Sequence, residues 1–161
     1  MAVDYFLKID GIKGESQDAT HKDEIDLITW NWGEAQTGSM AAGGGGGAGK
    51  VSMQDFHFTQ KVNDASPLLV LACATGEHFP KALLTCRKAG KEQQEYLKIK
   101  FTDLIVSSYQ TGGSASGDEI PTDAISLNYT KMEYGYARQK PDGTLDGMVW
   151  KGYDLKKMQK V

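Results

Sequence analysis

The residues that most resemble a chemical site lie in the glycine-rich segment 43–50, which reads GGGGGAGK. It approaches the phosphate-binding pattern G-x-x-x-x-G-K-[ST], in which a helix N-terminus and a hydroxyl after the lysine hold a nucleotide and its magnesium ion. Here Val51 stands where the hydroxyl is needed, and the next residues alternate as a strand does. We therefore disfavour a phosphate- or nucleotide-binding protein, which remains an alternative.

Other candidates for catalysis or metal binding are scattered along the chain. Segment 14–18 (GESQD) begins like the nucleophile turn G-x-S-x-G but lacks its last glycine. The acidic residues 23–26 follow a histidine, and a solvated turn explains them better than a cation site does. None of the three histidines has a second His or Cys at metal-ligand spacing: His21, His57 and His78. The sequence thus predicts no catalytic residue, no metal and no cofactor.

The elements that would position these residues are mostly strands, because apolar and polar residues alternate along much of the chain. Expected strands cover 5–9, 28–32, 51–62, 83–89, 97–109, 125–136 and 148–153. The apolar parity of segment 51–62 changes between Met53 and Phe56, which indicates a bulge or a twist. In the strand at 28–32, Ile28, Trp30 and Trp32 are expected to form the apolar face.

One short helix interrupts the strands. Ser66 is expected to cap its N-terminus, Pro67 suits its first turn, and Gly76 suits its end. Eight or so strands with one helix predict a mainly β fold: two antiparallel sheets forming a barrel or sandwich with the helix at its flank. We expect a single domain over 1–161, with a flexible glycine-rich loop at 38–49.

Composition and charge narrow the function classes. The chain has 161 residues, with 18 Lys and Arg against 21 Asp and Glu, a net charge of −3 that argues against binding nucleic acid through bulk charge. Cys73 and Cys86 are too few for a disulfide framework. The longest apolar run, 68–74, is too short to span a bilayer, and Asp4 interrupts any secretory signal. We expect a soluble protein of the reducing cytoplasm.

Several segments, taken together in this order and spacing, resemble the haemolysin-coregulated protein (Hcp) family of bacterial type VI secretion systems. The resemblance runs from the N-terminus to about residue 136, and the last 25 residues match loosely. Its segments are FLKIDGIKGES at 6–16, HKDEID at 21–26, WNWG at 30–33, the glycine-rich loop with KV at 50–51, DF at 55–56 with FT at 58–59, DASP at 64–67, AG at 89–90, EYL at 95–97 and VSS at 106–108.

The resemblance implies a secreted structural subunit and not an enzyme. Six subunits would form a ring with a wide channel, and rings would stack into a tube inside a contractile sheath and below a spike protein. Some members of the family carry small effector proteins inside the ring. The resemblance further implies assembly in the bacterial cytoplasm and release to the extracellular space or a target cell without a cleaved signal peptide.

The resemblance also suggests roles for particular residues. If apolar neighbours fill the core, the small polar residues between them face away from it and suit a water-filled channel that effectors slide through. These candidate lumen residues are Thr29, Asn31, Ser126, Asn128 and Thr130. The loop residues expected to contact a neighbouring subunit or ring are Gly43, Gly44, Gly45, Gly46, Gly47, Gly49 and Lys50. A monomeric barrel that binds a small apolar ligand is the other alternative.

Overall fold

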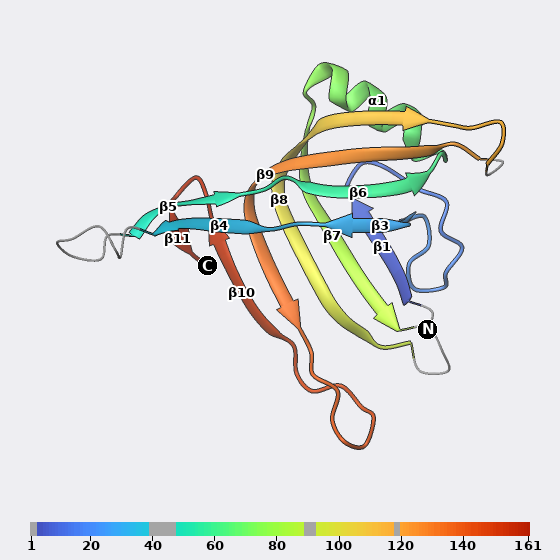
Figure 1. The fold of residues 1–161 in the computed structure, drawn as a ribbon. Coiled ribbons are helices and arrows are strands. Elements are labelled where there is room, and N and C mark those ends of the chain that lie inside the picture. Colours follow the sequence, from blue (N-terminus) through green and yellow to red (C-terminus); the bar gives the residue numbers. More distant parts are fainter. Residues whose placement is uncertain (1–2, 39–47, 89–92, 118–119) are drawn as a thin grey trace.

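The computed structural model describes residues 3–38, 48–88, 93–117 and 120–161 (Figure 1). Within them the chain forms eleven strands and one helix, and residues 39–47 of the expected loop lie outside. In chain order the elements are β1 (Val3–Ile9), β2 (Ile25–Asp26), β3 (Thr29–Asn31), β4 (Glu34–Gly38), β5 (Ala48–Met53), β6 (Phe56–Lys61), α1 (Ala65–Thr75), β7 (His78–Lys88), β8 (Glu95–Gly112), β9 (Thr122–Tyr136), β10 (Val149–Asp154) and β11 (Gln159–Lys160).

All strand pairs are antiparallel, and they form one large sheet and one small ribbon. The order of the large sheet is β11-β10-β9-β8-β7-β1-β2, and β6 joins it through β9 and carries β3 on its other side. Strands β4 and β5 pair only with each other and extend beyond the body of the molecule (Figure 1). The expected mainly β fold with one short helix is confirmed.

The long strands β8 and β9 turn a corner, and this bend gives the fold its two layers. Along β8 the buried side chains are odd-numbered up to Phe101 and even-numbered from Leu104 onward. At the corner, Asp103 has a positive φ of 48°. The first half of β9 pairs with β6 and its second half with β10, so β9 belongs to both layers.

The segment before β3 closes the gap between the layers without forming a continuous ladder. The Leu27 N–H donates to the Tyr5 carbonyl at 3.0 Å, and the Ile28 N–H donates to the Thr59 carbonyl at 2.8 Å. Neighbouring residues therefore bond first to β1 and then to β6. The result resembles a barrel that is not fully closed.

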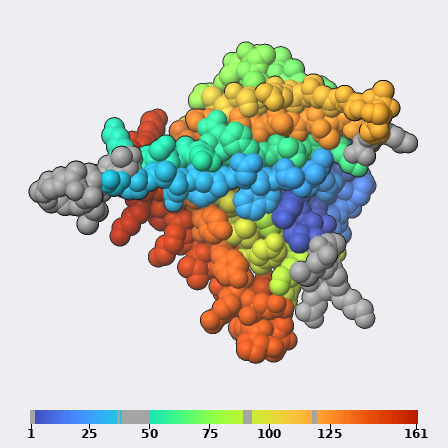
Figure 2. All heavy atoms as spheres, in the orientation of Figure 1, coloured from blue at the N-terminus to red at the C-terminus, as the bar shows by residue number. Residues whose placement is uncertain are grey.

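Aromatic rings fill the space between the layers. The rings of Phe56 and Phe101 lie 5.0 Å apart, and those of Phe101 and Tyr129 lie 4.6 Å apart. Helix α1 covers one end and buries Leu69 and Ala72. In the space-filling view it forms the top of the molecule, above β8 and β9 (Figure 2). Of the described helices, none is long and apolar enough to cross a membrane.

The helix begins two residues earlier than the cap prediction requires. Asp64 is the N-cap and makes no side-chain capping bond, so the prediction for Ser66 is wrong. The Ser66 hydroxyl instead donates to the buried Asp123 carboxylate at 2.7 Å. The prediction for Gly76 is confirmed, since it ends the helix with a left-handed φ of 68° that suits glycine.

Two other local expectations also have clear outcomes. The single strand expected over 51–62 is wrong: where the parity changes, after Met53, the chain leaves the ribbon strand β5 and enters β6 of the large sheet. Ile28 does not join the apolar face, because its side chain is 45% exposed where the chain crosses from β1 to β6.

The turn expected at the acidic residues is solvated at Asp23 and Asp26, which are exposed, but the histidine that precedes them is not. His21 is buried against the ring of Phe6, and its two ring nitrogens lie 2.9 Å from Glu24 and 2.7 Å from Glu95.

Candidate functional site, a polar sheet face

The candidate site is the outer face of a four-stranded sheet formed by β3, β6, the start of β9 and the end of β8. The alternation of β6 decides which side chains reach it. Phe56 and Phe58 are buried in the core, so His57 points to the opposite face, as the sequence predicts. This face is hereafter the polar face.

The strand register brings three of the five candidate lumen residues together. Asn31 lies opposite His57, and His57 lies opposite Ser126. In the next row Thr29 lies opposite Thr59, and their hydroxyl oxygens are 2.7 Å apart. Directly opposed residues share a face. A hollow of about 450 Å³ is lined there by Thr29, Asn31, His57 and Thr59, among others.

A β-bulge in β8 places two serines against one. The register between β8 and β9 shifts between Val106 and Ser108. The Ser107 and Ser108 hydroxyls therefore both bond to the Ser126 hydroxyl. Ser126 is only 2% exposed as a result, so it supports the polar face from beneath while Thr29 and Asn31 stay exposed.

One carboxylate organises the edge of the polar face. Asp55 accepts a hydrogen bond from the Ser107 hydroxyl at 2.6 Å and another from the Asn128 amide at 2.8 Å. Asn128 is thereby oriented and stays exposed. Thr130 lies farther along β9, at the corner, where its hydroxyl donates to the Thr102 carbonyl at 3.0 Å and its side chain is half-buried.

The polar face is a solvent-exposed surface of mostly uncharged side chains. His57 forms no hydrogen bond with Asp55 or Ser126, so these groups do not make a serine–histidine–carboxylate relay. Within the described ranges no three His, Cys, Asp or Glu side chains form a group that could hold a metal ion. The hydroxyls and amides of the polar face can donate hydrogen bonds to water or another molecule and accept them, and they favour neither positive nor negative groups strongly.

Of the predicted loop residues, the described ones belong to the β4–β5 ribbon. Gly49 and Lys50 lie in β5, and the chain continues from there as strand, as the sequence predicts. Lys50 therefore does not stand at a helix N-terminus as a phosphate loop requires. It lines a groove of about 1010 Å³ between the ribbon and β9–β10, together with Trp32 and Tyr153 among others.

The sequence-based predictions did not include the residues that hold the polar face in place through hydrogen bonds. The serine pair 107–108 was visible as a polar interruption of an apolar strand, which is a signal of a bulge. Nothing local in the sequence pairs Asp55 with Asn128, since 73 residues separate them and only the β6–β9 register brings them together.

A family model described as "Type VI secretion system effector, Hcp" matches residues 6–136 of the chain. The chain is 51% identical over 148 residues to Protein hcp1 of Pseudomonas aeruginosa, covering 91% of each. Among solved structures, one of a type six secretion system protein matches with a TM-score of 0.94 at 30% identity, covering 99% of this chain and 100% of the other. The crystal structure of Hcp1 from Salmonella typhimurium matches with a TM-score of 0.82 at 36% identity, covering 100% of both chains.

Proposed function

Because the chain belongs to the Hcp family of type VI secretion system proteins, we propose that it is a structural, non-catalytic subunit of the secreted inner tube. Six copies form a ring, rings stack into a tube, and the channel carries small effector proteins. The observation that carries the proposal is the polar face, because its four-stranded sheet has a free strand edge at each side among the described residues.

The two free edges support assembly from copies of the same chain. Strand β7 ends its pairing with β8 at Ile105, so among the described residues 106–112 of β8 pair only with β9. At the other side β3 pairs only with β6 in the described part of the chain. Unpaired backbone groups at a sheet edge favour pairing with another strand. Because the two edges differ, such contacts run head to tail and can close a ring.

A ring closed through these edges would make the polar face its continuous inner wall. Thr29, Asn31 and Asn128 would then contact effectors directly, and Ser126 and Thr130 would hold the wall from behind. Short neutral side chains give a channel little electrostatic preference, so cargo can bind weakly and still move. The proposal thus keeps all five expected lumen residues but gives them two roles, direct contact with effectors and support of the channel wall.

The β4–β5 ribbon supports stacking, since it extends beyond the body and could reach a neighbouring ring (Figure 1). We assign this contact to Gly49 and Lys50 in β5. From the sequence alone we add Gly43, Gly44, Gly45, Gly46 and Gly47, which lie outside the described residues. A contractile sheath around the tube and a spike protein at its tip complete the proposed partners. Assembly takes place in the bacterial cytoplasm and the tube is then secreted.

Electron microscopy with light scattering tests the proposal. The purified protein should form hollow rings of about 106 kDa, six times the 17.6 kDa chain. Asn31→Arg should keep the rings and release a bound effector, because six charged side chains would narrow the channel. Lys22→Arg, in the loop before β2, is the matched control and should keep both. A monomer at all concentrations would contradict the assembly, and unchanged cargo in Asn31→Arg rings would contradict the lumen assignment.

A further inference from the structure

The outer face of the other layer carries five lysines on neighbouring strands. The register places Lys98 beside Gly135 and Trp150 in one row, and Lys8, Leu83, Lys100 and Glu133 in the next. A third row contains Lys81, Thr102, Lys131 and Asp154. This set of rows, hereafter the lysine face, lies on β1, β7, β8, β9 and β10 and points away from the core, since Leu84, Ile99 and Phe101 of the same strands are buried.

The charges on the lysine face are not balanced. Five lysines face Glu133 and Asp154 in these rows and Glu95 at their border, a local charge of 5 − 3 = +2 on a chain whose net charge is −3. Only Lys98 has an ion-pair partner among the described residues, Glu95 at 3.7 Å. The nearest carboxylate to Lys131 across the register, Asp154, accepts the backbone N–H groups of residues 156 and 157.

A fixed aromatic ring lies within the lysine face. Trp150 covers Gly135 so closely that a Cβ at that position would lie 2.7 Å from the indole. The Lys100 ammonium stands 5.1 Å from the centre of the Trp150 ring, a cation–π contact. The indole is nevertheless 38% exposed. Tryptophan is among the residue types that most often contribute strongly to protein–protein binding.

We propose that the lysine face is the docking surface for an acidic protein partner. The excess of ammonium groups without an ion-pair partner favours carboxylates, and the exposed Trp150 on β10 offers an apolar contact at one corner of the lysine face, beside Lys100. Glu133 and Asp154 lie among the lysines and would repel a phosphate backbone, whereas a folded protein can place a basic residue opposite each. A protein therefore fits this surface better than a nucleic acid does.

The inference goes beyond the proposed function, and only the identity of the partner rests on it. The polar face and the lysine face belong to different layers, with the core between them. A ring whose channel is lined by the polar face would therefore turn the lysine face outward. The partner would be an acidic surface that surrounds the tube.

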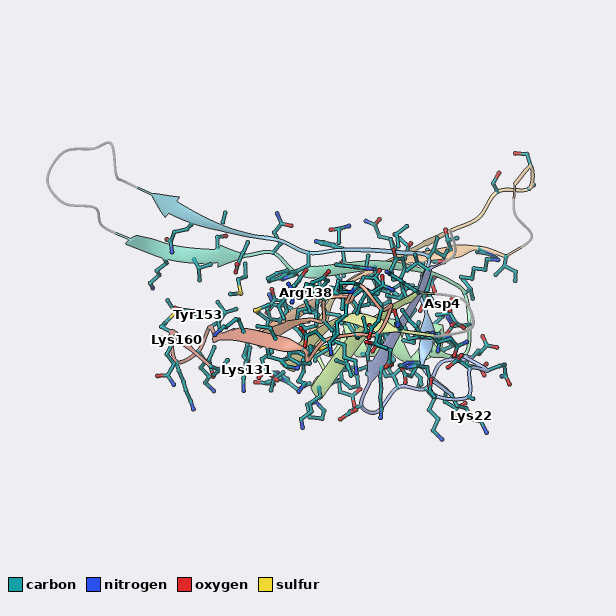
Figure 3. All side chains as sticks on the ribbon, turned by 90° about the horizontal axis from the view of Figure 1, so that it is seen from below. Asp4, Lys22, Lys131, Arg138, Tyr153 and Lys160 are labelled. Atoms are coloured by element: carbon teal, nitrogen blue, oxygen red, sulfur yellow. The ribbon has the colours of Figure 1, made fainter. Side chains whose placement is uncertain are left out.

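Binding of poly-L-glutamate to the assembled protein tests the inference. The triple variant Lys8→Gln, Lys100→Gln and Lys131→Gln removes three charges of the lysine face and keeps a flexible polar side chain at each position. The matched control Lys13→Gln, Lys22→Gln and Lys61→Gln removes three exposed charges elsewhere, and Lys22 lies at the far end of the molecule from Lys131 in Figure 3. The triple variant should bind about tenfold more weakly, with little change in the control.

Carbodiimide cross-linking of the unaltered protein to poly-L-glutamate gives a second readout that needs no variant. Peptide mapping should find the new amide bonds at lysines of the lysine face. Equal loss of binding in both variants, cross-links spread over all lysines, or tighter binding of duplex DNA or phosphatidylglycerol vesicles would overturn the inference. Light scattering follows the rings separately, so a monomer that still binds poly-L-glutamate through this face counts against the tube and not against the docking surface.

Discussion

The buried carboxylate of Asp123 should be one of the groups that hold α1 on the sheet. It is 1% exposed and accepts the Gln60 amide of β6 at 3.0 Å and the Ser66 hydroxyl of α1 at 2.7 Å. Asp123→Ala would leave two buried donors without this acceptor. At about 1–3 kcal/mol for each unsatisfied group, the free energy of unfolding should fall by about 2–6 kcal/mol.

The same residue gives a pH dependence with a definite sign. Burial alone would raise the pKa of Asp123, but the hydrogen bonds from Gln60 and Ser66 outweigh it and hold the pKa below the usual value of 3.8. A lowered pKa in the folded state adds stability above the unfolded value, and this stability is lost as the pH falls through the folded value. Stability should therefore fall below about pH 4 in the unaltered protein, and less steeply in Asp123→Asn.

Urea denaturation followed by circular dichroism measures both effects at one fixed protomer concentration, because the proposed assembly would add to the apparent stability. Asp10→Asn, at an exposed turn, is the control and should change the free energy of unfolding by no more than about 0.5 kcal/mol. If Asp123→Ala costs no more than Asp10→Asn, the carboxylate does not hold the helix and the reasoning is refuted.

The remaining predictions concern two thiols and one glycine. Burial raises the pKa of the Cys86 thiol to about 12, whereas Cys73 is only partly buried, so a thiol reagent at about pH 8 should modify Cys73 quickly and Cys86 only on unfolding. Equal rates for both cysteines in the folded protein would contradict this. Gly135→Ala should displace the Trp150 indole and change its fluorescence, since the added Cβ would lie 2.7 Å from the ring. An unchanged emission spectrum would show that the indole does not lie on the glycine.

Much of the fold could be predicted because one face of most strands is buried. The alternation at 97–101 and 125–129 specified which side chains enter the core, and these residues are buried as expected. The corner could not be predicted in the same way. At the corner the alternation of buried and exposed residues shifts by one in both strands, at Asp103 in β8 and next to Thr130 in β9. These two segments are distant in the sequence, so neither one alone predicts the bend.

The helix and the His21 region show a different limit. A serine near a helix start suggests a cap, yet Ser66 bonds to Asp123, which lies 57 residues away. His21 looked like part of a solvated turn because its partner Glu95 is 74 residues distant. A local pattern predicts the strand or helix to which a side chain belongs. It does not predict the hydrogen-bond partners of that side chain, because in a β fold these often lie on strands that are distant in the sequence.

The candidate site was predictable in its chemistry and less so in its exposure. Alternation placed Thr29, Asn31 and Asn128 on the outer face correctly. It could not show that Ser126 would be covered, because the bulge that covers it belongs to β8. The proposed assembly came from the resemblance to a family, because no pattern within one chain predicts how many copies join.

The central claim is that copies of this chain join through the free edges of the polar face and enclose it. A cryo-electron microscopy reconstruction of the assembled protein tests it most directly. The account predicts that residues 29–31 of one copy lie beside residues 106–112 of the next, with Asn31 facing the channel. Rings in which these two edges are solvent-exposed, or in which Asn31 faces outward, would contradict it.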